Sequence, residues 1–459
     1  MIQPSRLRVL ADLPTDPTAP YVLYWMQAAQ RAHFNHALEH AATLANQLKK
    51  PLLVCFGLMD DYPDANQRHY AFVLEGFAQL APLLQARRIK FVVNHGPAPE
   101  VALHHAKSAA VVVCDRNYLR HHIAWRAHVA AHAKKRVVQV ESEVVVPVET
   151  ASPKHEYAAR TLRPKIHKLY QDYLAPLPPV PLNHSALALK LAPNPRFPEL
   201  DPLTPSVTLA KLKLDRSVSL VSHYSSGETA ARTRLAAFVQ TSLATYAEGR
   251  NEPAAGATSH MSPYLHFGQI SPIEIALAAQ AAATPTPDRD AYIEELIVRR
   301  ELAMNHAFYN PRYDQFAGLP DWARKTLTAH ANDPRPHTYT LPQLEAAETR
   351  DPYWNAAQME MTRTGFMHNY MRMYWGKKIL EWSPTPELGF QWNLHLNNKY
   401  FLDGRDANSF TGVGWVYGLH DRPWGPERPI FGLIRYMNAA GLERKFDIDA
   451  YVKKVALLT

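Results

Sequence analysis

The sequence predicts two folded domains of different class. The N-terminal part reads as an α/β domain with a doubly wound, Rossmann-like parallel sheet, and the C-terminal part as an all-α domain. Short β-branched runs alternate with helix-compatible stretches up to about residue 148, a proline-rich segment follows, and such runs are absent after about residue 222. At 459 residues the chain is also longer than one hydrophobic core usually accommodates.

The α/β domain is expected over residues 1–150. Its strands are predicted at five apolar runs, 21–26, 51–58, 89–94, 110–115 and 137–148. Nearly continuous apolar strands that alternate with helices are typical of a parallel sheet covered on both faces. The region contains no GxGxxG and no GxxxxGK[ST]. This absence disfavours a nicotinamide dehydrogenase and a P-loop enzyme.

A linker is predicted over residues 151–221, because nine prolines fall between Pro176 and Pro205. Proline removes a backbone donor and fixes φ, so a segment of this composition should run along the surface between domains. The helical domain then covers residues 222–459. Its helical patterns are found at 227–250, 270–283, 290–308 and 354–382.

Composition restricts the setting in which the protein works. Cys55 and Cys114 lie inside apolar runs, which indicates buried, reduced thiols. No signal-like N-terminus and no apolar stretch of membrane-spanning length occurs. We therefore expect no membrane association and a cytoplasmic protein, associated with the nucleoid in a bacterium or archaeon. The net charge of +8 favours a polyanionic partner such as nucleic acid, although many basic proteins bind none.

One short motif suggests a metal. His36, Glu39 and His40 match the HxxEH pattern of a zinc-peptidase class, and His128 and His132 repeat its i, i+4 spacing. No later carboxylate cluster supplies a third ligand, and a solvated helix face gives the same pattern. We expect no metal site.

The segment from Trp354 to Trp424 is the most unusual part of the chain. It holds six of the nine tryptophans, interleaved with Arg, Asn and Asp. Trp375 and Trp382 are two helical turns apart, a spacing that by itself is more typical of core. Polar residues at this density would be costly in a sealed core, however, unless a ligand or one another satisfied them. The mixture suits a planar aromatic guest with polar edges.

Two further motifs are open to more than one interpretation. The hydroxyl-rich turn 258–265 can cap a helix, or its amides and hydroxyls can hold a phosphate at that helix N-terminus. Glu294 and Glu295 are adjacent on a predicted helix and point about 100° apart, so that only one can face a pocket.

In this order, the motifs resemble the photolyase/cryptochrome family, and specifically its class II cyclobutane pyrimidine dimer (CPD) photolyases. The matching segments span nearly the whole chain; they are VLYWMQ, ASPKHEYAARTLRPKI, SPYLHFGQISP, EELIVRREL, DPYWNAAQMEM, MHNYMRMYWGKKILEW, LDGRDANS and HDRPWG. The resemblance implies an N-terminal antenna domain, a long linker and a helical domain that holds U-shaped FAD. It also implies light-driven electron transfer from reduced FAD to a flipped-out dimer in DNA.

The resemblance assigns residues to the cofactor site. Tyr246 and the turn 258–262 should hold the FAD ribose and phosphates, and Arg372 paired with Asp403 should lie against the isoalloxazine. Asn397 should lie near flavin N5 and stabilise the reduced forms. The full implied cofactor set is Tyr246, Thr258, Ser259, His260, Met261, Ser262, Leu265, Gln269, Arg299, Asn369, Arg372, Asp403 and Asp406. An additional antenna chromophore, an 8-hydroxydeazaflavin or a folate, would bind the first domain.

The resemblance also implies residues for chemistry and electron transfer. Glu295, Met373 and Trp415 should form the lesion pocket, with Glu295 bonding the dimer and Trp415 as its apolar shelf. The implied electron wire consists of Trp354, Trp375, Trp382 and Tyr339. Two positions depart from class I relatives: Val413 replaces their flavin-proximal wire tryptophan, and Val298 replaces their second shelf tryptophan.

A Pro/Gly-punctuated loop or hairpin is the expected DNA contact. Arg422, Arg428 and Arg435 would bind phosphates, and Trp424 would fill the gap left by flipped bases. An ordinary surface loop with ion pairs is the alternative. The expected partner is UV-damaged double-stranded DNA, bound by a monomer. The alternative function is a cryptochrome-like blue-light sensor; the lesion residues and the lack of a long extension after Thr459 favour repair.

Overall fold

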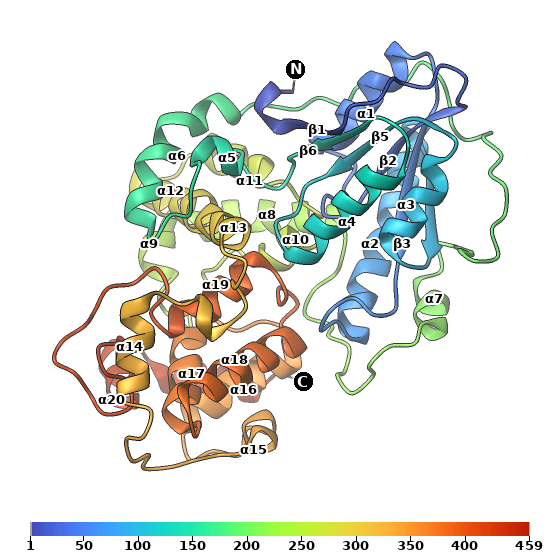
Figure 1. Cartoon of the computed structure of the whole chain (residues 1–459). Helices are drawn as coiled ribbons and strands as arrows, with labels where there is room; N and C mark the ends of the chain where they lie inside the picture. The colour runs from blue at the N-terminus through green and yellow to red at the C-terminus, as the bar shows by residue number, and fades with distance from the viewer. Residues whose placement is uncertain (1, 459) are drawn as a thin grey trace.

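The computed structural model describes residues 2–458 and has an α/β part and a helical part packed side by side (Figure 1). The α/β part is built on one seven-stranded sheet in the order β1-β6-β5-β2-β3-β4-β7. Its strands are β1 (Leu7–Ala11), β2 (Tyr21–Trp25), β3 (Leu52–Leu58), β4 (Lys90–His95), β5 (Ala109–Asp115), β6 (Val137–Val140) and β7 (Glu199–Leu200). The predicted fold class is confirmed.

The five predicted strands form the parallel centre of this sheet. Both edges are antiparallel additions that the sequence did not predict: β1 pairs with β6, and β7 pairs with β4. The prediction for the last run was too long, because β6 ends at Val140 and the chain continues to Val146 as buried irregular backbone.

Helices cover both faces of the sheet, as continuous apolar strands require. On one face, Val22, Tyr24 and Val54 pack against α1 (His36–Gln47) and α2 (Gln67–Ala86). On the other face, Leu23 and Trp25 pack against α3 (Ala98–Ala106) and α4 (Arg120–His132). Asn35 caps α1 by accepting the Leu38 N–H. Side-chain alternation along each strand therefore supplies two separate cores.

The linker has structure of its own. Helix α6 (Ala159–Tyr173) follows α5 (Val148–Ala151), and α7 (Pro205–Lys211) lies beyond the prolines. Between them, the proline-rich chain crosses the edge of the sheet and adds β7 there, with Glu199 opposite Asn94. The linker is therefore tied to the α/β domain rather than free of it.

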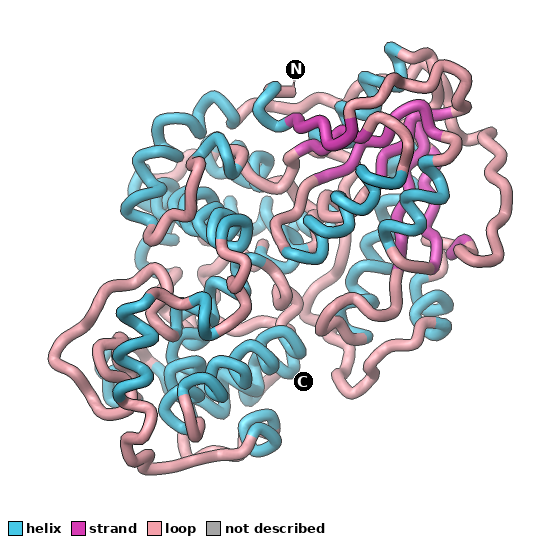
Figure 2. Tube along the Cα trace, in the orientation of Figure 1, coloured by secondary structure: helices cyan, strands magenta, loops and turns pink. Residues whose placement is uncertain are grey.

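Helices make up almost all of the regular structure after residue 222 (Figure 2). They are α8 (Glu228–Thr241), α9 (Tyr246–Gly249), α10 (Ser262–His266), α11 (Pro272–Ala281), α12 (Thr286–Ile293), α13 (Arg300–Tyr309), α14 (Asp321–Ala329), α15 (Leu341–Glu345), α16 (Pro352–Thr364), α17 (Asn369–Trp382), α18 (Pro386–Tyr400), α19 (Ala407–Val416), α20 (Ala439–Lys445) and α21 (Ile448–Ala456). A π-helical turn, η3 (Glu294–Arg299), joins α12 to α13. Among residues 2–458, no helix is long and apolar enough to cross a membrane.

The predicted helix at 354–382 is two helices. Gly365 adopts a left-handed φ of 73° and ends α16, and a Cβ at this position would lie 2.8 Å from Leu402 Cγ. Asp351 caps the start of α16 by accepting the N–H groups of Tyr353 and Trp354. The break lets α16 and α17 pack against each other.

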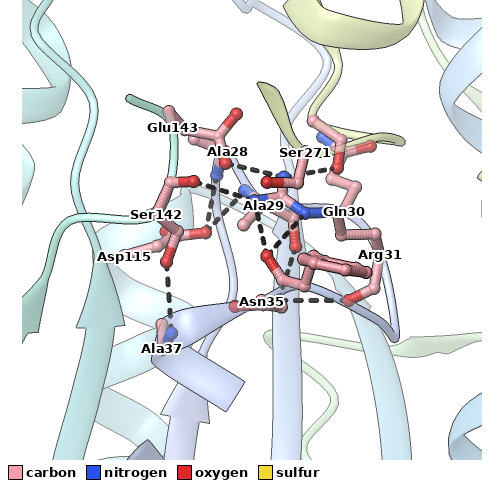
Figure 3. Close-up of polar contacts among 12 residues, drawn as sticks. Ala28, Ala29, Gln30, Arg31, Asn35, Ala37, Asp115, Ser142, Glu143 and Ser271 are labelled. Atoms are coloured by element: carbon pink, nitrogen blue, oxygen red, sulfur yellow. Dashed lines mark hydrogen bonds and ion pairs between the residues drawn. The ribbon is translucent and has the colours of Figure 1, made fainter. Parts of the chain in front are cut away.

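A buried polar network joins the two parts (Figure 3). Asp115, at the carboxyl end of β5, accepts the backbone N–H groups of Gln27, Ala28 and Ala29 at 2.7–3.3 Å and so holds the loop after β2. Arg31 on that loop bonds Glu143 Oε1 at 2.7 Å and the Gly268 carbonyl of the helical domain at 2.9 Å. Every one of these groups is buried, so the interface is costly to open.

Glu301 of α13 makes a second buried link by accepting the backbone N–H groups of Val145 and Val146. Burial raises the pKa of Glu301 to about 8. Between the usual carboxyl pKa and about 8, the folded protein holds a proton that the unfolded chain has released, so this group's contribution to stability is lost as pH rises. As pH rises, the free energy of unfolding of wild type should therefore fall relative to that of Glu301→Gln, by up to about 1.4 kcal/mol per pH unit.

Urea unfolding of both proteins at several pH values from about 5 to 8 measures this difference. A constant gap between the two free energies of unfolding would contradict the assignment to Glu301.

Candidate active site

A cavity of about 610 Å³ opens within the helical domain. This size falls in the ~300–1,000 Å³ range of cofactor and small-molecule sites. Most of the predicted site residues line it; they are Tyr246, Ser259, Met261, Ser262, Leu265, Glu295, Arg299, Asn369, Arg372, Met373, Asp403, Asp406, Trp415 and Arg435. Sequence segments almost 190 residues apart therefore meet at one site.

One wall of the cavity is an ion pair between α17 and the turn after α18. Arg372 Nη2 lies 3.3 Å from Asp403 Oδ1, and both side chains are largely buried. The Arg372 guanidinium also lies 3.8 Å from the centroid of the Phe401 ring. The pair presents a fixed cation and a fixed anion to the cavity, which is an arrangement that can recognise a planar polar ring.

The N-terminus of α19 forms a second wall. Asp406 caps this helix by accepting the Asn408 N–H at 2.6 Å, and its Oδ2 lies 3.5 Å from His266 Nδ1. Although burial opposes it, hydrogen bonding from His266 lowers the pKa of Asp406 below its usual value. Further along α19, Thr411 lines the cavity, and its buried Oγ1 has no hydrogen-bond partner among the described residues. An orphaned hydroxyl at this point indicates a ligand.

Glu295 reaches the cavity from the π-helical turn η3, a kind of irregularity that is frequent at functional sites. The turn separates the two adjacent glutamates. Glu294 pairs with Arg163 at 2.7 Å and with Arg299 at 3.0 Å, whereas Glu295 pairs with Arg250 at 2.6 Å. About a third of each side chain in the Arg250–Glu295 pair remains exposed. Glu295 is therefore held at the cavity but can exchange partners.

Trp415 also lines the cavity. The Arg299 guanidinium is 5.5 Å from its ring centroid, within cation–π range. Val298, the neighbour of Arg299, is buried in the core of the helical domain and does not line the cavity. On η3, a cation rather than a second aromatic shelf thus lies against the Trp415 ring.

The predicted wire residues form a continuous aromatic series. Trp375 stacks on Trp354 with centroids 6.4 Å apart and an interplanar angle of 8°. Trp354 contacts Trp382 at 5.5 Å, and Trp382 contacts Tyr339 at 5.1 Å. At the inner end, Trp375 is 6.3 Å from Phe401, the ring that Arg372 covers. The series therefore runs from the cavity wall outward to the half-buried Tyr339.

Four of the residues predicted for the cofactor or for catalysis lie outside the cavity lining. Asn397 is buried behind Ser409, to whose Oγ its Nδ2 donates. Gln269 instead bonds Ser226 Oγ and the Gly227 N–H, at 2.9 and 2.8 Å. His260 has a φ of 54°, and its ring lies against Tyr224 and Phe366 rather than in the cavity. Thr258 does not line the cavity either. Helix α10 begins at Ser262 without a side-chain cap.

The predicted DNA loop lies at the rim of the cavity. Trp424 is held between the Arg422 and Arg435 guanidinium groups, 4.6 and 5.0 Å from its ring centroid. Arg428 lies 4.8 Å from the Tyr436 ring and exchanges two backbone hydrogen bonds with Gly432. The loop is therefore a short hairpin with its three arginines exposed.

Sequence reasoning missed several lining residues. These include Arg250, His266, Lys377, Ser409, Thr411, Asp421 and Lys445. It also missed a second, smaller cavity of about 120 Å³ between the α/β and helical domains, lined in part by Met26, Phe56, Tyr62, Trp125 and Arg405. Several of these residues, such as His266, Lys377 and Asp421, lie within the matching segments, but no pattern in those segments indicates which side chains face a cavity, since that depends on tertiary packing.

The cysteines and the HxxEH segment lie elsewhere. Cys55 and Cys114 are free and fully buried in β3 and β5, as predicted, and burial raises the pKa of both thiols. Glu39 is paired with Arg87 at 2.8 Å and also accepts the Val180 N–H. Its carboxylate therefore tethers the linker to α1.

Comparison with known proteins gives four informative matches. A sequence profile described as DNA photolyase matches residues 22–182. The deoxyribodipyrimidine photo-lyase of Methanothermobacter thermautotrophicus is 46% identical to the chain over 455 residues, which cover 99% of both proteins.

Two solved structures share the fold. The crystal structure of a class III photolyase from Agrobacterium tumefaciens matches 97% of this chain and 87% of its own, with a TM-score of 0.72 and 20% identity. The archaeal photolyase from Sulfolobus tokodaii, whose structure is described as containing two FAD molecules, matches 94% of this chain and 89% of its own, with a TM-score of 0.70 and 14% identity.

Proposed function

Because the chain belongs to the DNA photolyase family, we propose that it is a class II CPD photolyase, an FAD enzyme that repairs UV-damaged double-stranded DNA in a light-dependent reaction. The observation that carries the proposal is that Glu295, Met373 and Trp415 line the same cavity as Arg372 and Asp403. A blue-light sensor would need Arg372 and Asp403 but would not need Glu295, Met373 and Trp415.

The cavity fits FAD in its chemistry. Hydroxyl and backbone groups of the 259–262 turn suit a diphosphate and ribose, and the Arg372–Asp403 pair suits the polar edge of a flavin ring. The orphaned Thr411 hydroxyl would gain a partner. Asn397 would act through Ser409, which it bonds directly. When bound and reduced, FAD supplies the excited-state electron that splits the cyclobutane ring.

The protein itself would bind and orient the lesion. Trp415 offers an apolar face for the stacked pyrimidines, and Glu295 accepts hydrogen bonds from their polar edges once it leaves Arg250. Arg250 and Arg299, released or partly exposed, then lie where the backbone phosphates of a flipped dinucleotide would enter. Burial of the lesion would exclude water from the site.

The DNA loop would contact the duplex at the lesion. Its exposed Arg422, Arg428 and Arg435 match phosphates, and Trp424 can stack in the space that the flipped bases leave. The aromatic series from Trp375 to Tyr339 would carry electrons from the surface to the cavity.

Repair of a defined oligonucleotide tests the proposed function. Purified protein, reduced chemically under anaerobic conditions, should remove a single thymine dimer under blue light and leave it intact in the dark. Flavin released by denaturation should be FAD at close to one per chain. Absence of repair by fully reduced, FAD-loaded protein would overturn the proposal in favour of the light sensor.

We also propose that an antenna chromophore, an 8-hydroxydeazaflavin or a folate, places its polar edge in the second cavity. Arg405 is 3% exposed there, and its Nε and Nη1 have no partner among the described residues. At about 120 Å³ the cavity holds only part of such a ring system, so the rest would lie toward its mouth. An absorption band beyond that of flavin should disappear in Arg405→Met while FAD content stays near wild type. A band that persists would contradict this location.

A further inference from the structure

Lys377 is a buried cation at the edge of the active-site cavity. Its side chain is 3% exposed, and its Nζ donates a hydrogen bond to the carbonyl of Val416, the last residue of α19. Trp415, the proposed lesion shelf, directly precedes Val416. Lys377 therefore connects α17 to the helix end that carries the shelf.

Backbone bonds account for the other carbonyls at this helix end. The Gly414 carbonyl accepts the N–H groups of Tyr417 and Leu419, and the Trp415 carbonyl accepts that of Gly418. The Val416 carbonyl is the one that Lys377 satisfies. A cation is favourable at this position because the carbonyl end of a helix carries partial negative charge. Loss of the ammonium would loosen the turn next to Trp415.

Lys377 is also coupled to the DNA loop. Lys377, Asp421 and Arg435 line the same cavity. Burial lowers the pKa of Lys377, whereas the charge of Asp421 raises it and that of Arg435 lowers it. Asp421 Oδ1 in turn accepts the Trp424 indole N–H at 3.1 Å and the Arg422 backbone N–H at 2.8 Å. The two charged groups acting on Lys377 thus belong to the turn after α19 and to the loop that would contact DNA.

We propose that Lys377 is a positioning residue that, in its charged form, holds the Trp415 helix end and the Asp421–Trp424 turn together for lesion binding. This inference rests on the proposed function. One buried lysine would thereby align two elements, the shelf and the DNA loop.

The inference makes lesion binding dependent on pH. Burial lowers the pKa of Lys377 to about 7, so that charged and neutral forms are both populated near neutrality. Bound phosphates favour the charged form, and binding would therefore take up a proton. The dissociation constant for damaged DNA should then rise above about pH 7, by at most about tenfold per unit.

Dissociation constants for one oligonucleotide, with and without a thymine dimer, test this between about pH 6 and 9 at constant ionic strength. Wild type should lose preference for the dimer as pH rises. Lys377→Met should bind it more weakly with little pH dependence. Asp421→Asn keeps the acceptor for Trp424 but removes the negative charge. The midpoint, the pH at which half of the preference for the dimer is lost, should therefore be lower in this variant than in wild type. Lys378→Met, which removes the neighbouring cation, should follow wild type.

The outcomes are distinguishable. Wild-type pH dependence in Lys377→Met, or an unchanged midpoint in Asp421→Asn, would overturn the inference and leave the proposed function standing. A wild-type protein that shows no preference for the dimer at any pH would overturn both. Because Asp421 is partly exposed and its variant is isosteric, this second variant decides the question even where Lys377→Met folds poorly.

Discussion

Replacing Trp375 by phenylalanine should slow light-driven reduction of the bound flavin by about tenfold or more, since a rise of ~1.4 kcal/mol in a barrier already has that effect. Trp375 is the member of the aromatic series nearest the cavity wall, and the next ring, Trp354, is 6.4 Å further out. Phenylalanine is much harder to oxidise than tryptophan. The reaction is followed by flavin absorbance under blue light with an external reductant.

The same variant should still repair DNA after chemical reduction, because the proposed wire would only reduce the flavin and would not contact the lesion. Trp392→Phe is the matched control: Trp392 packs against the same core but makes no ring contact with the series. Trp375→Phe also leaves Gln358 Oε1 without its indole partner, which lies 2.8 Å away in wild type, so FAD content must be measured first. Unchanged photoreduction at equal FAD content would remove Trp375 from the wire.

The sequence predicted the centre of the sheet because buried parallel strands are apolar throughout. The two edge strands were not predicted, because they are not apolar along their length. Strand β1 exposes much of its length, and β7 is two residues long in a proline-rich segment, so neither produces an apolar run. The run at 137–148 is apolar because Val144–Val146 are buried as loop against the helical domain. Apolar character reports burial and does not by itself distinguish a strand from a loop.

Within the candidate site, motif resemblance identified fewer than half of the lining residues, and of their contacts it identified the Arg372–Asp403 pair. Lys377 and Lys378 are equivalent in sequence, yet one is buried against α19 and the other pairs with Glu381. The conformation of the 258–262 turn, with its positive φ at His260, likewise decides which side chains reach the cavity. Such differences arise from packing between segments far apart in the chain, which local patterns do not encode.

Glu295 shows the same limit most clearly, because its ion-pair partner Arg250 lies 45 residues earlier, in a segment without a motif. Both side chains are about one-third exposed, and exposed pairs contribute little to stability, typically below about 1 kcal/mol. Glu295→Ala should therefore fold and keep FAD. Loss of a charged hydrogen bond to the dimer, worth ~1.5–3 kcal/mol, should weaken lesion binding or repair about 10- to 100-fold.

Glu294→Ala provides the comparison for Glu295→Ala, since it removes a carboxylate from the same π-helical turn but breaks the contacts to Arg163 and Arg299 instead. Repair yield per photon and affinity for the dimer oligonucleotide, both normalised to FAD content, should fall far more in Glu295→Ala. If FAD content falls in parallel with repair, then Glu295 supports the cofactor rather than the lesion. Arg250→Met leaves the Glu295 carboxylate in place, so it should keep a higher FAD-normalised affinity for the dimer than Glu295→Ala. Equal losses in both variants would show that the ion pair acts as one unit.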